Sequence, residues 1–157
     1  MEEISRFRYL NKSLEDINKM IFTNSDGGAR GNPGPAAIGI IVRDENKVLE
    51  EFVEVLKKPS TNNVAEYMAL IKALEVASKH TKGEITCVLD SELVVKQLLG
   101  EYRVKNPFLM KLFLEVQKLQ NRFDKITYKH VKRDDKNQKY VDYILNKKLD
   151  EKFGKKK

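Results

Sequence analysis

The sequence predicts an α/β fold in which a mixed five-stranded sheet carries helices on both faces. Three β-rich segments follow one another near the start of the chain, and helical segments then alternate with two further strands. Strands joined by short turns form antiparallel pairs, whereas two strands connected through a helix become parallel neighbours. A single sheet that contains both kinds of pair, covered by helices, accommodates this order of elements.

Each strand is predicted from a short run of β-branched and aromatic residues bounded by turn residues. The five runs are 20–25, 36–43, 47–57, 84–89 and 125–131. The first run stops at DGGARGNPGP, where glycine and proline favour a turn. The third run alternates in the way expected for a more exposed strand.

The helices are predicted from apolar residues that recur at helical spacing. They cover 63–80, 91–99, 107–123 and 138–152. Pro107 suits the first turn of a helix, and Gly100 suits the residue after a helix end.

The chain of 157 residues is long enough for one domain with a sizeable core. We expect residues 1–19 to form an N-terminal extension, residues 20–153 the folded domain and residues 154–157 a basic tail. Ser13 and Asp16 resemble a helix-capping pair within the extension, and a loosely ordered segment is the alternative.

Composition excludes several classes of protein. Hydrophobic residues make up 41% of the chain, which is too many for a disordered protein, and no apolar run approaches the roughly 20 residues of a membrane span. The charged N-terminus is unlike a secretory signal, and the single Cys87 lies in an apolar run, so we expect a buried free thiol and a cytoplasmic location. The net charge of +7 favours a polyanionic partner only weakly, because many proteins that bind no nucleic acid are mildly basic.

Four acidic residues are the most informative group among the many lysines: Asp26, Glu66, Asp90 and Asp142. Asp26 and Asp90 end the first and fourth predicted strands, whose carboxyl ends would share one edge of the sheet if these strands were parallel neighbours. Glu66 falls in the first turn of its helix, and Asp142 lies near the start of the last helix. Four carboxylates at one edge repel one another unless cations lie between them, and hard oxygen ligands select Mg²⁺ or Mn²⁺ over zinc.

Each carboxylate also has a purely structural explanation. Asp26 suits a glycine-rich turn, and Asp90 suits the N-cap of the next helix. Glu66 suits a capping box with Asn63. For Asp142 the structural explanation is weaker, because the residue falls at the edge of the apolar stripe of its helix, where an unpaired carboxylate is costly.

Four motifs occur together in one order: TNSDGGARGNPGPAAIGIIV, STNNVAEYMALIKAL, VLDSELVVKQLLGEYRVK and VDYILNKKLDE. Through these motifs, over about residues 20–150, the chain resembles the type 1 ribonuclease H family, in the variant that lacks the basic protrusion and the separate hybrid-binding domain. The resemblance implies an RNase H-like fold and a metal-dependent endoribonuclease that hydrolyses the RNA strand of RNA–DNA hybrids. It matches the four carboxylates to the family's catalytic, metal-binding residues: Asp26, Glu66, Asp90 and Asp142.

The chemistry of this family implies two Mg²⁺ ions per site, with Mn²⁺ as the alternative: one activates the attacking water and the other stabilises the leaving 3′ oxygen. The expected products carry a 5′-phosphate and a 3′-hydroxyl. By the resemblance, Asp26 would bridge both ions, Glu66 and Asp90 would complete one side, and Asp142 would complete the other. An RNA–DNA hybrid is then the expected partner, no membrane is involved, and a monomer is the family default.

The resemblance also implies residues that distinguish RNA from DNA, which requires a contact to the 2′-hydroxyl. It assigns ribose contacts to Asn32, Asn62 and Glu66. Backbone groups in the turn that starts at Gly28 suit a shallow minor groove. Ordinary helix capping is the alternative explanation for the paired asparagines.

Contacts to phosphates are expected from two sets of residues. Thr61 and Asn63 match a pocket that grips a phosphate of the DNA strand. Basic side chains downstream would contact other phosphates, with a solvated basic surface as the alternative: Lys96, Arg103 and Lys105.

Two positions depart from the family pattern. Glu92 stands where many relatives carry Gln, and a carboxylate cannot donate a hydrogen bond to the RNA as an amide can. His130 falls too early for the mobile histidine that some relatives use in product release, so we expect it to be structural. The VKR segment instead indicates Arg133 for this role, and His80 is expected at the surface near a helix end.

Other functions remain open from the sequence. A nuclease of the same fold would act on duplex RNA or DNA junctions, and a catalytically inactive module would bind nucleic acid without cutting it. The complete carboxylate set argues against the inactive module. A basic scaffold protein that binds other proteins is a third alternative, and it predicts no dependence on metal.

Overall fold

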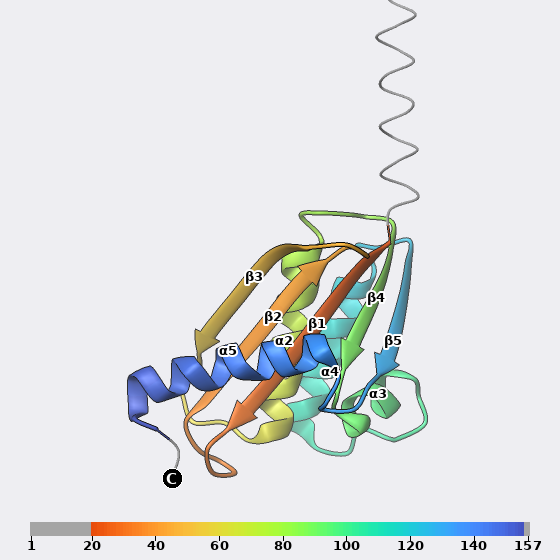
Figure 1. The fold of residues 1–157 in the computed structure, drawn as a ribbon. Coiled ribbons are helices and arrows are strands. Elements are labelled where there is room, and N and C mark those ends of the chain that lie inside the picture. The colour runs from red at the N-terminus through yellow and green to blue at the C-terminus, as the bar shows by residue number, and fades with distance from the viewer. Residues whose placement is uncertain (1–19, 156–157) are drawn as a thin grey trace, which may run out of the picture.

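A computed structural model describes residues 20–155 of the chain. The expected extension at 1–19 and the last residues of the tail, 156–157, lie outside the described residues. Five strands form one sheet in the order β3-β2-β1-β4-β5 (Figure 1). The strands are β1 (Ile21–Ala29), β2 (Ala36–Arg43), β3 (Val48–Val55), β4 (Glu84–Leu89) and β5 (Lys125–His130).

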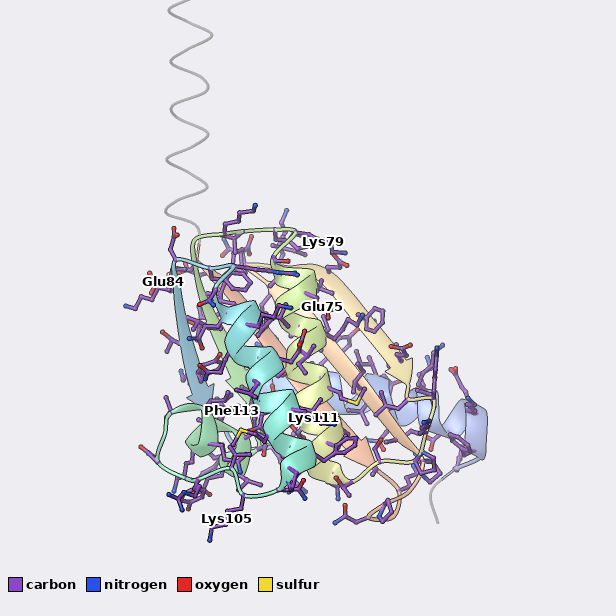
Figure 2. All side chains as sticks on the ribbon, turned by 180° about the vertical axis from the view of Figure 1, so that it is seen from behind. Glu75, Lys79, Glu84, Lys105, Lys111 and Phe113 are labelled. Carbon is purple, nitrogen blue, oxygen red and sulfur yellow. The ribbon has the colours of Figure 1, made fainter. Side chains whose placement is uncertain are left out.

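Helices cover both faces of this sheet. They are α2 (Asn62–Ala77), α3 (Glu92–Leu98), α4 (Pro107–Gln120) and α5 (Lys136–Phe153). Helix α5 crosses one face, and Figure 2 shows α2 and α4 lying together over the opposite face, with Phe113 on α4. The predicted α/β fold, a mixed five-stranded sheet with helices on both faces, is confirmed.

The pairing of the strands follows from their connections. β1 is antiparallel to β2, and β2 is antiparallel to β3, because short turns join them. β4 is parallel to β1 and to β5: α2 connects it to β3, which runs in the same direction as β1, and α3 and α4 connect it to β5. The first and fourth strands are therefore the parallel neighbours that would place Asp26 and Asp90 at one edge.

Two apolar clusters fill the space between the sheet and the helices. The larger cluster lies beneath α2 and α4 and includes the fully buried side chains of Tyr67, Leu70 and Leu74. The smaller cluster lies beneath α5 and contains Ala37, Leu145 and Leu149. Helix α5 approaches the sheet closely at Gly39, where a Cβ atom would stand 3.0 Å from the carbonyl oxygen of Val141.

Two findings bear on expectations from composition. Cys87 is fully buried and free, as predicted, and burial raises the pKa of its thiol to about 12. Among residues 20–155, none of the helices has the length and apolar character needed to cross a membrane.

The largest boundary error concerns the first strand, which was predicted to end at residue 25. It continues to Ala29, because residues 26–29 pair with residues 36–39 of β2. Helix α5 also begins two residues earlier than predicted, where the side chain of Asp135 accepts hydrogen bonds from the backbone amides of Asn137 and Gln138.

Candidate metal centre

Asp26, Glu66 and Asp90 come together at one edge of the sheet. Each offers a carboxylate oxygen, and these oxygens all lie within 4.8 Å of one another. In the parallel pair of β1 and β4, the last matched residues are Asn24 and Val88. Asp26 and Asp90 each lie two positions beyond this match, so the register of the two strands places them side by side.

Glu66 reaches the cluster because α2 packs directly on the backbone of β1. A Cβ atom at Gly27 would stand 2.2 Å from the carbonyl oxygen of Ala65, so only glycine permits this approach. The backbone amide of Gly27 donates to Oε1 of Glu66 at 3.4 Å. The glycine after Asp26 thus brings the helix carboxylate to the strand carboxylate.

The structure excludes the capping explanations for these residues. Ser91, not Asp90, is the N-cap of α3, and Thr61 is the N-cap of α2. The prediction that Glu66 lies in the first helical turn is wrong, because α2 begins earlier than predicted. The prediction that Asp26 ends its strand is also wrong, because Asp26 lies within β1 and pairs there with β2.

Burial determines how the cluster titrates without a cation. Asp26 is 6% exposed and Glu66 is 9% exposed. Burial is the main cause that raises the pKa of Asp26 to about 7, and the charges of Asp90 and Asp142 add to it. Burial likewise raises the pKa of Glu66 well above its usual value. The pKa of Asp90 is raised by burial too, although the nearby charge of Arg133 opposes this shift.

The donor set fits a hard divalent cation. Among the described residues, Oε2 of Glu66 is buried and has no hydrogen-bond partner. A buried acceptor of this kind is costly unless something pairs with it. Carboxylate oxygens are the ligands that Mg²⁺ and Mn²⁺ prefer, and a cation would offset both the burial and the mutual repulsion that raise the three pKa values. The three residues could therefore hold such an ion.

Asp142 lies at the same cleft but differs from the other three carboxylates. It lines the cleft with them, yet it is exposed on α5, and Nδ2 of Asn146 donates to its Oδ1 at 3.1 Å. The predicted cost of burying Asp142 at the edge of an apolar stripe is wrong, because Leu145 and Leu149 face the sheet while Asp142 stays accessible to water.

The predicted substrate-binding residues fall into three groups. The first group lines the cleft beside the carboxylates: Gly28, Asn62, Asn63 and Arg133. Asn32 and Thr61 line an adjoining groove, to which Asn63 also contributes. Glu92 forms the third group, because it is exposed on the first turn of α3 and pairs with Nζ of Lys96 at 2.7 Å.

The two asparagines brace the glycine-rich turn against α2. Oδ1 of Asn32 accepts from the backbone amide of Asn62 at 2.9 Å, and Oδ1 of Asn62 accepts from the backbone amide of Ala29 at 2.9 Å. The turn and the start of α2 are thereby held as one unit, with amide groups at the mouth of the cleft.

One histidine lies beside the cleft, and the other contacts a residue that does not line it. A ring nitrogen of His130 lies 3.2 Å from the backbone carbonyl of Asp90, close to the cleft. His80 is exposed, as predicted, and its Nε2 lies 2.8 Å from Oε1 of Glu50.

Sequence reasoning missed a pair of buried amides behind the cleft. Asn24 is fully buried and Gln138 is 1% exposed. Both left a signal in the sequence: Asn24 is a polar residue inside a β-rich run, and Gln138 lies four residues before Asp142, on the same side of the helix.

Comparisons with known proteins agree with this geometry. A family model described as "Reverse transcriptase-like" matches residues 24–144. A bifunctional protein of Mycobacterium tuberculosis is 40% identical over 132 residues, covering 83% of this chain and 35% of that protein. The ribonuclease HI of Halobacterium salinarum is 37% identical over 127 residues, covering 80% of this chain and 62% of that protein. The chain thus spans about a third of the first relative and less than two thirds of the second.

Three solved structures align with this chain over nearly the whole of their own length. The N-terminal RNase H domain of the Mycobacterium tuberculosis protein, solved as a fusion with maltose-binding protein, has a TM-score of 0.79 at 39% identity, covering 85% of this chain and 96% of that one. The RNase H1 of Halobacterium salinarum has a TM-score of 0.78 at 34% identity, covering 84% and 98%. LC11-RNase H1, which comes from compost and was solved in complex with an RNA/DNA hybrid, has a TM-score of 0.77 at 38% identity, covering 84% and 98%.

Proposed function

The chain belongs to the ribonuclease H family, and from this premise we propose that it hydrolyses the RNA strand of RNA–DNA hybrids. The observation that carries the proposal is the cluster of Asp26, Glu66 and Asp90, whose oxygens lie within 4.8 Å of one another. LC11-RNase H1, which was crystallised with an RNA/DNA hybrid, supports the choice of substrate.

The carboxylates would hold two divalent cations, Mg²⁺ or Mn²⁺. Asp26, Glu66 and Asp90 suit one ion, because their oxygens converge. Asp142 would complete the second site from across the cleft, together with Asp26. When bound, the cations lower the pKa of an attacking water and stabilise the leaving 3′ oxygen, which leaves a 5′-phosphate and a 3′-hydroxyl.

Recognition of RNA would come from the braced turn. The end of β1 at Gly28, the turn that follows it and the start of α2 present backbone and amide groups beside the carboxylates. These groups suit a 2′-hydroxyl, which both donates and accepts a hydrogen bond. Asn32, Asn62 and Glu66 are the proposed ribose contacts, and Thr61 with Asn63 would hold a phosphate of the DNA strand in the adjoining groove.

Basic residues near the cleft would bind the phosphate backbone. Lys96, Arg103 and Lys105 are the proposed contacts, and Figure 2 shows Lys105 at the end of the molecule to which β4 and β5 point. Arg133 lines the cleft itself, and its charge opposes the rise that burial causes in the pKa of Asp90, so a phosphate product would compete for the same guanidinium. Arg133 is therefore the proposed group that assists product release.

The decisive experiment offers labelled RNA–DNA hybrid, duplex RNA, duplex DNA and a DNA junction, each with Mg²⁺, with Mn²⁺ and with chelator. We expect cleavage of only the RNA strand of the hybrid, with no cleavage in chelator. Asp90→Asn should lower kcat at least about 100-fold, because it removes a ligand from the metal site. Asp124→Asn is the matched control, since Asp124 is exposed at the opposite edge of the sheet, just before β5.

The outcomes separate the alternatives. Hybrid cleavage that survives Asp90→Asn would overturn the metal mechanism. Equal cutting of duplex RNA or of the junction would indicate the same-fold nuclease of other specificity. Tight hybrid binding without any cleavage would indicate an inactive binding module.

A further inference from the structure

Gln138 is a buried amide at the start of α5, one helical turn before Asp142. Its Oε1 accepts from Nδ2 of Asn24 at 3.0 Å, and its Nε2 donates to the backbone carbonyl of Ser25 at 2.9 Å. Both bonds cross from helix α5 to strand β1. Gln138 is also the first fully buried residue of α5, so it is the point at which the start of the helix is attached to the sheet.

The orientation of this amide is determined by an arginine. Arg43 Nε donates to Oδ1 of Asn24 at 2.8 Å, and its guanidinium lies over the ring of Phe22 at 4.5 Å. An arginine can only donate, so Oδ1 of Asn24 must face it and Nδ2 must face away. Nδ2 then selects Oε1 of Gln138, which turns the Nε2 group of Gln138 toward β1. Each amide therefore has one orientation that satisfies the whole chain of bonds.

These bonds join strand β1, which bears Asp26, to helix α5, which bears Asp142. The carbonyl of Ser25 belongs to the peptide unit that leads directly into Asp26. Asp90 follows β4, the strand that pairs in parallel with β1 next to this attachment point. Asp142 lies four residues after Gln138, on the same side of α5. One amide thus holds the backbone of β1 immediately before Asp26 and lies on the helix that bears the fourth carboxylate.

We propose that Gln138 is a positioning residue that sets the separation between Asp142 and the cluster of Asp26, Glu66 and Asp90. It acts through the carboxylates and does not touch the substrate. The inference rests on the proposed function for its catalytic readout, while its effect on cation binding can be measured without substrate. If Gln138 only satisfied buried polar groups, replacing it would lower the stability of the fold and leave kcat and the Mn²⁺ affinity of the folded protein unchanged.

The test uses Gln138→Met, which keeps the length of the side chain and removes both hydrogen bonds. We expect kcat to fall about ten- to hundredfold while KM changes less than about twofold, because the bound substrate is gripped elsewhere. Mn²⁺ titrated calorimetrically into the protein without substrate should bind roughly tenfold more weakly. Gln138→Glu keeps one acceptor and should show the same direction of change in both measurements.

Lys139→Ala is the control, because Lys139 is the exposed neighbour of Gln138 on α5. Circular dichroism and thermal unfolding establish how much of each variant is folded, and Gln138→Glu replaces Gln138→Met if the latter does not fold. A folded Gln138 variant with the kcat and the Mn²⁺ affinity of the control would overturn the proposal. A loss of kcat that equals the loss of folded protein would also overturn it. If the wild type cuts no hybrid, the proposed function fails, and the Mn²⁺ titration alone decides the role of Gln138.

Discussion

The face of the sheet beneath α2 and α4 rests on a large apolar cluster, whereas the face beneath α5 rests on a small one. Hydrogen bonds compensate for part of the smaller apolar contact beneath α5. Gln138 attaches the start of α5 to β1, and Arg30 attaches its end to the glycine-rich turn. The first face is held mainly by apolar contacts, which have no direction, and the second depends more on hydrogen bonds, which specify distance and orientation.

This difference divides the candidate metal site. Glu66 comes from a helix in the large core, and Asp26 and Asp90 come from adjacent strands that this core supports. Asp142 comes from the helix that directional bonds hold in place, and it is exposed. The molecule thus takes the three buried carboxylates from elements packed on the large core and the fourth from the helix that hydrogen bonds fix to the sheet.

The largest expected effect on stability separates the two faces. Leu74→Ala should lower the free energy of unfolding by about 4–5 kcal/mol, because α2 is enclosed between the sheet and α4 and the cavity cannot collapse. Leu149→Ala removes the same atoms from an equally buried side chain and should lower it by only about 2–3 kcal/mol, because α5 can settle onto the sheet. Urea unfolding measures both values, and equal losses would contradict the comparison.

A second prediction concerns the buried carboxylates without metal. The pKa of Asp26 is raised from 3.8 to about 7, so between these pH values the folded protein keeps a proton that the unfolded chain releases. The folded state therefore loses stability as pH rises through this window. In chelator at pH 8, Asp26→Asn should be more stable than the wild type by roughly 1–3 kcal/mol.

Mg²⁺ provides the complementary measurement. It should raise the Tm of the wild type at pH 8 more than at pH 5, because the carboxylates must be ionised to bind it. It should leave the Tm of Asp26→Asn nearly unchanged. A wild type that is more stable than Asp26→Asn in chelator at pH 8 would refute the argument.

The smallest effect is expected at the far end of α5. The Arg30 guanidinium donates to Oδ1 of Asp150 at 2.5 Å, to the carbonyl of Asn146 at 3.2 Å and to the carbonyl of Gly154 at 2.9 Å. Arg30→Ala should lower the free energy of unfolding by about 1 kcal/mol and speed hydrogen exchange in the last turns of α5. Lys148→Ala breaks an exposed pair and should change stability by less than about 0.5 kcal/mol. Equal exchange rates in the two variants would show that Arg30 does not hold the helix end.

The order of elements was predictable because it depends on local patterns. The strands predicted at 36–43 and 84–89 have the bounds of β2 and β4. The first strand was underestimated, because Gly27 and Gly28 indicate a turn unless a partner strand pairs with them. The alternatives in which Asp90 or Asn63 caps a helix could not be excluded from the sequence for a similar reason: several neighbouring polar residues suit a cap, and only the observed geometry shows that Thr61 and Ser91 fill it.

The sequence by itself determined the succession of strands and helices and singled out Asp26, Glu66, Asp90 and Asp142, because periodicity and motif are properties of neighbouring residues. The tertiary structure alone decided that Glu66 is buried with an unpaired oxygen and that Asp142 is exposed. It also decided that Gln138 meets Asn24, 114 residues away along the chain. Such distances depend on how α2 and α5 pack on the sheet, and no local pattern specifies the packing of elements so far apart in sequence.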